Sequence, residues 1–206
     1  MRLSTFRFFL VAMFIESICI KDGKAPLLSF HQDRMDRTYQ YYFKNDNPYQ
    51  LGTYVEEVPT NGTYKLRIIY DRMVRKYNYA LYIKPDTASL QVVSTPAIEY
   101  YFKHADRTSL DTLYGQRNYK DDIIIVNDGL VSDAYYANLV FWDGEEWYTP
   151  QHSLLQGVRR QYLLNTRQIK AKKITAEDIF FYERVSLVNA MLDLEDLTVG
   201  IENVFQ

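Results

Sequence analysis

A lysine that follows an aromatic stretch is the side chain in this sequence best suited to covalent chemistry. Lys103 comes directly after the aromatic run at residues 100–102. Packing against these rings would partly remove the amine from water, which disfavours the ammonium form and leaves an amine able to form a Schiff base. A lysine at the end of a strand is also commonly just solvated. Lys103 is therefore a candidate nucleophile that needs support from its surroundings.

Three further features could accompany such a lysine. Asp133 follows a hairpin strand, and Asn138 begins the next strand five residues later. Gly157 stands near the start of a predicted helix, where backbone amides can approach a phosphate. Arg34 lies three residues after His31 in another predicted helix, and a guanidinium there could bind a phosphate with two hydrogen bonds. Each also has an ordinary explanation, as a turn acid, an incidental glycine or a solvated helix face.

Composition excludes several other functions. The chain has 206 residues, with 24 Lys and Arg against 26 Asp and Glu, and its hydrophobic fraction of 47% is typical of a folded globular protein. The small net charge and the lack of a basic run argue against nucleic-acid binding. One cysteine, Cys19, allows no internal disulfide, and three scattered histidines argue against a metal site. The 19 tyrosines suit strand-rich cores, pocket walls and subunit interfaces.

The elements that would position these residues alternate between strands and helices. In the first half we expect a strand from Met13 to a tight turn at Asp22-Gly23, a helix at 31–44, paired strands at 63–70 and 78–84 joined by a turn at 71–77, and a strand at 90–93. In the second half we expect helices at 109–119 and 154–164, strands at 123–127, 130–132, 137–142 and 185–192, hairpin turns at 127–129 and 143–144, and a helix capped by Thr175 and Asp178 that runs to Arg184.

This order predicts a mixed α/β (α+β) fold in two lobes. We expect a small N-terminal α+β lobe at residues 13–96 and a larger C-terminal α/β lobe at 97–206, with a cleft between them. Residues 1–12 are expected to be a strand extension or the product of a misplaced start. A secretory signal is the alternative, because Arg2 and Arg7 precede an apolar run, but no small-residue cleavage site follows. That run is too short to span a membrane, and we expect a cytoplasmic protein.

The combination and order of these features resembles the aminotransferase class IV family, the fold type IV pyridoxal-phosphate enzymes. This family includes branched-chain and D-amino acid transaminases and aminodeoxychorismate lyase. The resemblance extends from about Phe14 to Asp196. It is carried by FIESI at 14–18 with its Asp-Gly turn, His31-x-x-Arg34, KHADR at 103–107, DDIIIVNDG at 121–129, Asp133 with Asn138, Thr149-Pro150 with Gly157-Val158-x-Arg160, and Asn189-Ala190.

The resemblance implies a two-lobed enzyme with pyridoxal 5'-phosphate in the cleft and a role for each motif. Lys103 would bind the cofactor covalently and then act as base and acid at the substrate carbon. Asp133 would lie against the pyridine nitrogen and keep it protonated, and Asn138 would brace the Asp133 loop. The resemblance also implies a homodimer that acts on a small amino substrate. From composition and the short apolar run we expect no metal, nucleic acid or membrane as partner.

The phosphate and the substrate have their own implied contacts. The phosphate would be bound by the side chain of Arg34, the backbone around Gly157, Val158 and Arg159, and the region of Asn189 and Ala190. Weaker candidates for a substrate carboxylate are Arg67, Arg72 and Arg107.

The branch of the family is less constrained than the cofactor. The spacing from Lys103 to Arg107 looks most like aminodeoxychorismate lyase, because several transaminases have a tyrosine where this chain has Arg107. A small branched-chain or D-amino acid transaminase is the nearest alternative. A non-catalytic member is the third, since Ala190 replaces a Ser or Thr that many members use and the N-terminal lobe is short. The family also usually has Glu where this chain has Asp133.

Overall fold

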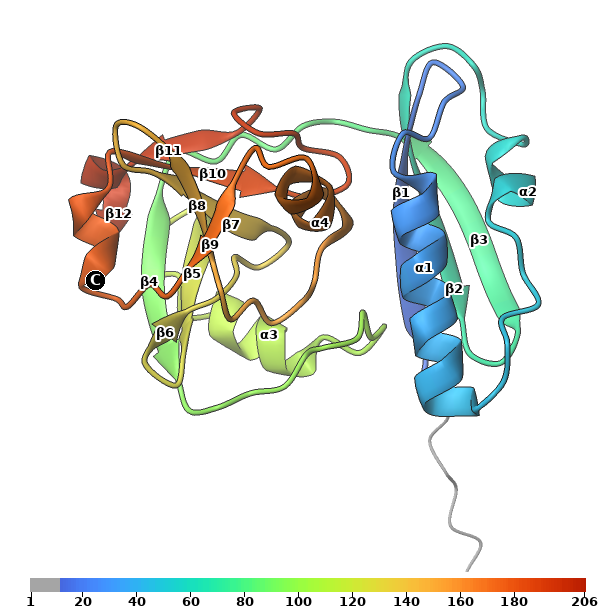
Figure 1. Ribbon diagram of the computed structural model, residues 1–206, viewed down its shortest axis with the longest axis horizontal. Coiled ribbons are helices and arrows are strands. Elements are labelled where there is room, and N and C mark those ends of the chain that lie inside the picture. The colour runs from blue at the N-terminus through green and yellow to red at the C-terminus, as the bar shows by residue number, and fades with distance from the viewer. Residues whose placement is uncertain (1–11) are drawn as a thin grey trace, which may run out of the picture.

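The computed structural model describes residues 12–206, so nearly all of the predicted N-terminal extension lies outside the described residues. Figure 1 shows two lobes, one formed by residues 12–81 and the other by the elements that follow.

The strands are β1 (Phe14–Lys21), β2 (Thr63–Tyr70), β3 (Val74–Leu81), β4 (Leu90–Thr95), β5 (Asp122–Asn127), β6 (Leu130–Val131), β7 (Asn138–Trp142), β8 (Trp147–Pro150), β9 (Lys170–Lys172), β10 (Arg184–Val188), β11 (Thr198–Gly200) and β12 (Val204–Phe205). The α-helices are α1 (Leu28–Thr38), α2 (Gly52–Val55), α3 (Thr108–Tyr114) and α4 (Val158–Asn165).

The small lobe is an antiparallel sheet in the order β1-β2-β3, with α1 packed on one face. Alternate residues of β1 point to the same face of a sheet, and Phe14, Ile18 and Ile20 are almost completely buried there against Met35 of α1. The predicted tight turn after β1 is present, because Asp22 and Gly23 have φ of 48° and 73°.

The residue limits predicted for the second strand of the hairpin and for the helix of the small lobe were wrong. The turn after β2 is shorter than predicted, and β3 begins at Val74 rather than at 78. Asp71 closes this turn, since its side chain accepts a hydrogen bond from the backbone N–H of Met73 at 2.8 Å. The polar residues that suggested a long turn instead belong to an exposed edge strand, where charged side chains are common. The predicted helix begins earlier, at Leu28, and its last turn, Tyr39–Phe43, is a π-helix.

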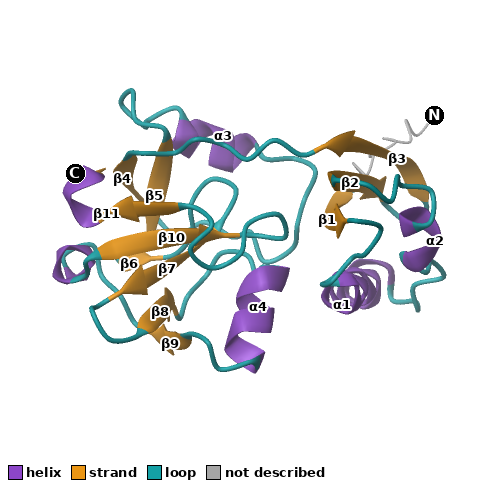
Figure 2. Cartoon of the chain, turned by 90° about the horizontal axis from the view of Figure 1, so that it is seen from above, coloured by secondary structure: helices purple, strands orange, loops and turns teal. Residues whose placement is uncertain are grey.

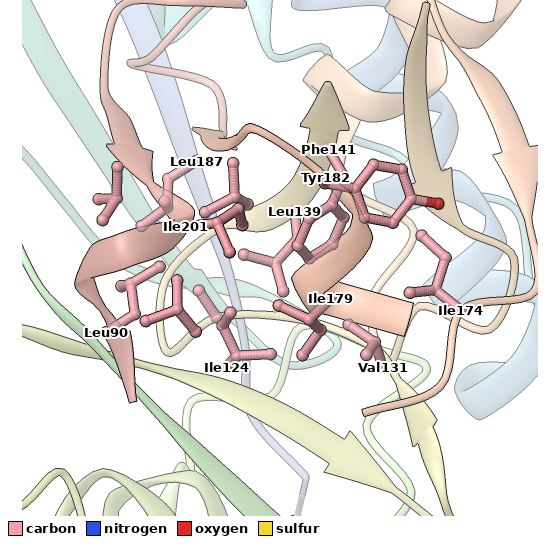
Figure 3. Close-up of a cluster of buried hydrophobic side chains, with 14 of the residues drawn as sticks. Leu90, Ile124, Val131, Leu139, Phe141, Ile174, Ile179, Tyr182, Leu187 and Ile201 are labelled. Atoms are coloured by element: carbon pink, nitrogen blue, oxygen red, sulfur yellow. The ribbon is translucent and has the colours of Figure 1, made fainter. Parts of the chain in front are cut away.

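The large lobe has two sheets that enclose one core. Their strand orders are β12-β4-β5-β6 and β11-β10-β7-β8-β9. Figure 3 shows side chains of both sheets meeting, with Leu90 and Ile124 from the first and Leu139 and Phe141 from the second. The other face of β5 packs against α3, so β5 is buried on both faces, which explains its continuous β-branched run. The predicted hairpin after β5 is present, with Asp128 and Gly129 at positive φ.

The boundary between the lobes falls earlier than the sequence indicated. We predicted it after residue 96, but β4 pairs with β5 and β12 and therefore belongs to the large lobe. The connection between the lobes is the segment between β3 and β4, which Figure 1 shows crossing from one lobe to the other. The buried apolar side chains of β4 pack in clusters formed by residues of the large lobe.

Three helices are shorter than predicted. α4 begins at Val158 rather than at 154, because Gly157 before it has extended backbone with ψ of 143°. The helix predicted to run to Arg184 is a single 3₁₀ turn, Asp178–Phe181. Its capping hydrogen bond is present, with the N–H of Thr175 donating to the carboxylate of Asp178 at 2.8 Å. Extended backbone then leads directly into β10. The helix predicted at 109–119 also ends early, at Tyr114.

The segment that carries Lys103 is held on the edge of the small lobe. The N–H of Ile15 donates to the carbonyl of Lys103 at 2.9 Å, and the N–H of Ala105 donates to the carbonyl of Met13 at 2.7 Å. A short stretch of the large lobe's chain therefore extends the sheet next to β1. These backbone bonds fix Lys103 at the junction of the two lobes. None of the helices formed by residues 12–206 has the length and apolar composition that a membrane-spanning helix needs.

Phe14 is the side chain that packs this junction, which gives a first prediction. Its ring is completely buried, with centroids 4.9 Å from His104 and 4.7 Å from Tyr42. Replacing it with Ala should lower the free energy of unfolding by about 3–5 kcal/mol, through lost transfer energy and the cavity left behind. Denaturant unfolding measures this loss. The control, Phe181→Ala, removes a ring that is 81% exposed and should change stability by less than about 0.5 kcal/mol. Equal effects of the two substitutions would contradict the packing described here.

Candidate active site

A cavity of about 390 Å³ lies between the lobes, and residues of both form its walls. Strands β1 and β2 contribute from the small lobe, and the Lys103 segment, the β6–β7 loop, the start of α4 and the end of β10 contribute from the large one. Figure 2 shows α1 and α4 at the same side of the molecule. The rings of Phe30 and Tyr162 join these helices at 6.1 Å between centroids. The cavity is therefore bounded by elements far apart in the sequence.

Lys103 faces this cavity with an amine that is easily deprotonated. The pKa of Lys103 is lowered to about 7, and burial is the largest cause. The positive charges of Arg34 and Arg107 also lower this pKa, and their effect exceeds the opposite effect of the carboxylates of Glu16 and Asp133. An ordinary lysine has a pKa near 10.4. Near neutral pH a large fraction of this amine is therefore neutral and able to attack a carbonyl carbon.

Asp133 lines the same cavity and is braced by two hydrogen bonds. The side-chain amide of Asn138 donates to its Oδ1 at 2.7 Å, and the N–H of Leu155 donates to its Oδ2 at 2.8 Å. Burial raises the pKa of Asp133 to about 6, although these bonds and the charge of Arg160 act in the opposite direction. The carboxylate is thus fixed in place, and a positively charged partner in the cavity would favour its ionised form.

The start of α4 offers backbone donors to the cavity. Gly157 and Val158 line it, and the first N–H groups of a helix have no acceptor within the helix. A side chain at 157 would collide with the Oδ1 atom of Asn138, so only glycine allows this close approach. Asn189 and Ala190, after β10, line the same cavity. The side-chain oxygen of Asn189 accepts from the N–H of Met191 at 2.8 Å, which fixes this turn. Such a helix N-terminus is suited to binding an anion.

Arg34 lines the cavity in front of a buried carboxylate that the sequence analysis gave no role. Glu16 is completely buried, and its two oxygens accept from Nε and Nη2 of Arg34 at 2.9 and 2.5 Å. The Nδ1 atom of His31 lies 2.5 Å from the same carboxylate. Burial alone would raise the pKa of Glu16, but Arg34 and His31 hold it at about 2. The sequence signal for this ion pair was Glu16 itself, an acidic residue on the inward face of β1, because a buried carboxylate requires a positively charged partner.

The structure separates the remaining sequence candidates. Arg67 and Arg107 line the cavity. Arg72 lies instead in the exposed turn between β2 and β3, outside the cavity, because the chain reverses there. The side chain of Arg159 is turned away to Asp193, at 2.8 Å, so only its backbone could serve the site. The predicted residues that line the cavity are Arg34, Arg67, Lys103, Arg107, Asp133, Asn138, Gly157, Val158, Asn189 and Ala190.

Arg160 was part of a recognised motif but received no role from the sequence. It is 5% exposed, and it donates from Nε to the hydroxyl of Thr149 at 3.0 Å and from Nη2 to the carbonyl of Pro150 at 2.8 Å. Its charge lowers the pKa of Asp133. Arg160 therefore joins α4 to the Thr149-Pro150 motif. Its positive charge also favours the ionised form of the Asp133 carboxylate.

Comparison with known proteins gives the family. The sequence matches the amino-transferase class IV family model over residues 13–195. An uncharacterized protein of Haemophilus influenzae is 33% identical over 181 residues, covering 85% of this chain and 96% of that one. A crystal structure from Haemophilus somnus, provisionally described as a 4-amino-4-deoxychorismate lyase, has a TM-score of 0.83 and 29% identity over 89% of this chain and 98% of that one. A hypothetical aminotransferase from Mycobacterium tuberculosis, in its PLP-bound form, shares the fold with a TM-score of 0.75 and 16% identity, over 93% and 81% of the two chains.

The fold and the site define a two-lobed enzyme that gathers a lysine amine, a braced carboxylate and a helix N-terminus around one cavity. The chain belongs to the class IV aminotransferase family, the fold type IV enzymes that depend on pyridoxal phosphate.

The low pKa of Lys103 predicts selective reactivity. Lys103 should react with an amine-directed reagent along a curve that rises with pH through about 7, because its neutral fraction grows there. Exposed lysines should rise only near pH 10. Competitive labelling followed by mass spectrometry measures both in one sample. In Arg107→Gln the midpoint for Lys103 should move to higher pH, because a neighbouring positive charge is lost. A wild-type midpoint near 10 would contradict the proposed surroundings of the amine.

The close approach of Gly157 to Asn138 gives a double-mutant prediction. Gly157→Ala should destabilise the protein by about 1–3 kcal/mol, because the new methyl group collides with the amide of Asn138. The same change in an Asn138→Ala background should cost less, since the obstructing side chain is gone. Thermal or denaturant unfolding of the four proteins gives the coupling. Gly52→Ala is the matched control, because a Cβ there meets no atom within 4 Å. Additive costs at 157 and 138 would refute the contact.

Proposed function

We propose that this protein binds pyridoxal 5'-phosphate in the cavity and acts as a 4-amino-4-deoxychorismate lyase. The observation that supports this most is that Lys103, Asp133 and the N-terminus of α4 all line one cavity. The aldehyde, the basic ring nitrogen and the phosphate of the cofactor each need a different partner. Lys103 offers an amine, Asp133 offers a carboxylate, and the N-terminus of α4 offers backbone donors. The residues present therefore fit the cofactor.

Each part of the cofactor has a residue suited to hold it. Lys103 would hold the aldehyde carbon through its amine, and Asp133 would face the pyridine nitrogen and stabilise its protonated form. The backbone at Gly157 and Val158, together with Arg34, would bind the phosphate. When bound, pyridoxal phosphate supplies an electron-withdrawing ring that makes the proton on the substrate's amine-bearing carbon acidic.

Lys103 is the group that would move this proton. In its neutral form this amine would accept the proton from the amine-bearing carbon of the substrate, and in its protonated form it would return the proton as an acid. A pKa of about 7 matches this exchange, since both forms are populated near neutral pH. In the lyase reaction pyruvate leaves the neighbouring carbon and the ring remains as 4-aminobenzoate. Arg107 and Arg67 are the candidate partners for the substrate carboxylates.

Two observations favour the lyase over a transaminase. Arg107 follows Lys103 at the spacing that resembles the lyase branch, and it lines the cavity. The Haemophilus somnus structure, which matches this chain over 98% of its length, is provisionally described as a 4-amino-4-deoxychorismate lyase. The proposal includes a role in folate synthesis, a cytoplasmic location and a homodimer. Exposed apolar side chains on the edge strand β3, among them Tyr77, Tyr79 and Leu81, are compatible with a subunit contact.

Turnover tests the proposal directly. Purified protein with pyridoxal phosphate should release pyruvate from aminodeoxychorismate in equal amount to 4-aminobenzoate. Lys103→Ala should lose at least about a thousandfold in rate, because both the covalent attachment and the proton transfer disappear. Asn138→Asp keeps the size of the brace but cannot donate to Asp133, and it should retain measurable turnover. Amino transfer from amino acids to 2-oxo acids, without pyruvate release, would replace the lyase with a transaminase. Protein that takes up no cofactor would overturn both.

A further inference from the structure

Lys103 lies at the centre of a tight turn whose two neighbouring side chains are held outside the cavity. The N–H of His104 donates to the carbonyl of Phe102 at 2.8 Å, which closes a three-residue turn around Lys103. Lys103 lines the cavity, whereas Phe102 and His104 do not. Their rings pack instead against Tyr42, with centroids 5.0 and 5.7 Å from that of the tyrosine ring. The direction of the Lys103 side chain therefore depends on how its two neighbours are held.

Tyr42 connects the small lobe to this turn. It belongs to the π-helix Tyr39–Phe43, and its ring centroid also lies 4.7 Å from that of Phe14 on β1. A π-helical turn is rare and is often found at functional sites. Tyr42 is partly buried, and its ring stands between the two residues that flank Lys103. One side chain of the small lobe thus contacts both ends of the turn that carries the reactive amine.

A hydrogen bond between Tyr42 and His104 joins the two segments beside the lysine. The hydroxyl oxygen of Tyr42 lies 3.2 Å from Nε2 of His104, between residues 62 positions apart in the sequence. Burial lowers the pKa of His104, and the carboxylate of Asp106 opposes this only in part, so the imidazole is neutral at neutral pH. One nitrogen of a neutral imidazole is an acceptor, and the Tyr42 hydroxyl can donate to it. This polar contact fixes the rotation of the imidazole within its aromatic surroundings.

His104 is held a second time, through its backbone. The hydroxyl of Tyr100, a buried residue, donates to the carbonyl of His104 at 2.8 Å. Nη1 of Arg107 in turn donates to the hydroxyl of Tyr100 at 3.5 Å. Arg107 is one of the cations that lower the pKa of Lys103. His104 therefore links Tyr42 on one side to the Tyr100–Arg107 pair on the other, and a change at Tyr42 would affect both the position of the amine and the charge beside it.

We propose that Tyr42 and His104 are positioning residues that direct the Lys103 amine into the cavity. The inference rests on the proposed function, because it gives them a part in the reaction of that amine. Neither side chain lines the cavity, so they act through the turn at 102–104 and not on the substrate. Loss of their hydrogen bond keeps the rings in place but lets the turn move. A displacement of about 1 Å at a reacting group can cost on the order of a hundredfold in rate.

Removal of one hydroxyl group tests this with little change in packing. Tyr42→Phe should lower kcat for aminodeoxychorismate at least about tenfold while KM changes less than about twofold, because the amine that moves the proton is affected and substrate binding is not. The midpoint of Lys103 labelling should rise by about half a pH unit or more, since a looser turn admits water to the amine. Tyr41→Phe is the matched control, because it removes the same hydroxyl from the adjacent residue, which is 59% exposed. It should leave both values unchanged.

Variants at residue 104 separate positioning from general stability. His104→Gln keeps a polar atom near the place of Nε2 and should retain most of kcat, whereas His104→Leu should be at least as slow as Tyr42→Phe. Adding Tyr42→Phe to His104→Leu should cost nothing further, because both changes remove the same contact. Tyr42→Phe keeps every ring, and it decides the matter alone if His104→Leu does not fold.

The outcomes distinguish this inference from the proposed function. Equal kcat and equal labelling midpoints in Tyr42→Phe and Tyr41→Phe would overturn the inference and leave the cofactor chemistry intact. A His104→Gln variant as slow as a folded His104→Leu would do the same. Protein that forms no coloured cofactor complex would overturn the proposed function, and the labelling midpoints of that protein would still decide whether Tyr42 and His104 position the amine.

Discussion

The position of one amine, held by backbone hydrogen bonds to the edge of the opposite lobe, is the constraint on which the site depends. The carbonyl of Lys103 accepts from Ile15, and the segment continues the small lobe's sheet. The side chain is thereby kept in the cavity between the lobes, away from bulk water. Burial and two neighbouring guanidinium groups then lower the pKa of Lys103 to about 7. A lysine on a free loop would have neither the position nor the altered acidity.

A buried ion network supports this arrangement. Arg34 raises the local positive charge near Lys103, yet a guanidinium buried without a partner would destabilise the fold. Glu16 compensates by binding Arg34 through two hydrogen bonds, and His31 adds a third contact to the same carboxylate. Because the pKa of Glu16 is about 2, below its unfolded value of 4.5, its contribution to stability is present above pH 4.5 and is lost as pH falls toward 2. The site therefore combines structural and electrostatic roles in the same residues.

Local signals predicted the turns and long elements, and non-local contacts determined the rest. The turns at Asp22-Gly23 and Asp128-Gly129 follow from residues that tolerate positive φ. The limits of α4 and β3 did not follow, because the close approach of Gly157 to Asn138 and the exposure of β3 depend on distant segments. The short strands β8, β9, β11 and β12 carry too few residues for a periodic pattern. For the site, motif order suggested the lysine and the carboxylate, whereas Glu16, Arg160 and Tyr42 acquire their surroundings only in the folded chain.

Lys103 is the amine that we propose reacts with the cofactor aldehyde. Borohydride converts an imine between an aldehyde and a lysine into a permanent bond, so peptide mass spectrometry of the reduced, cofactor-loaded protein identifies the lysine. One pyridoxyl group per chain is expected, on the peptide that contains Lys103. A label on another lysine, or no label after incubation with pyridoxal phosphate, would contradict it.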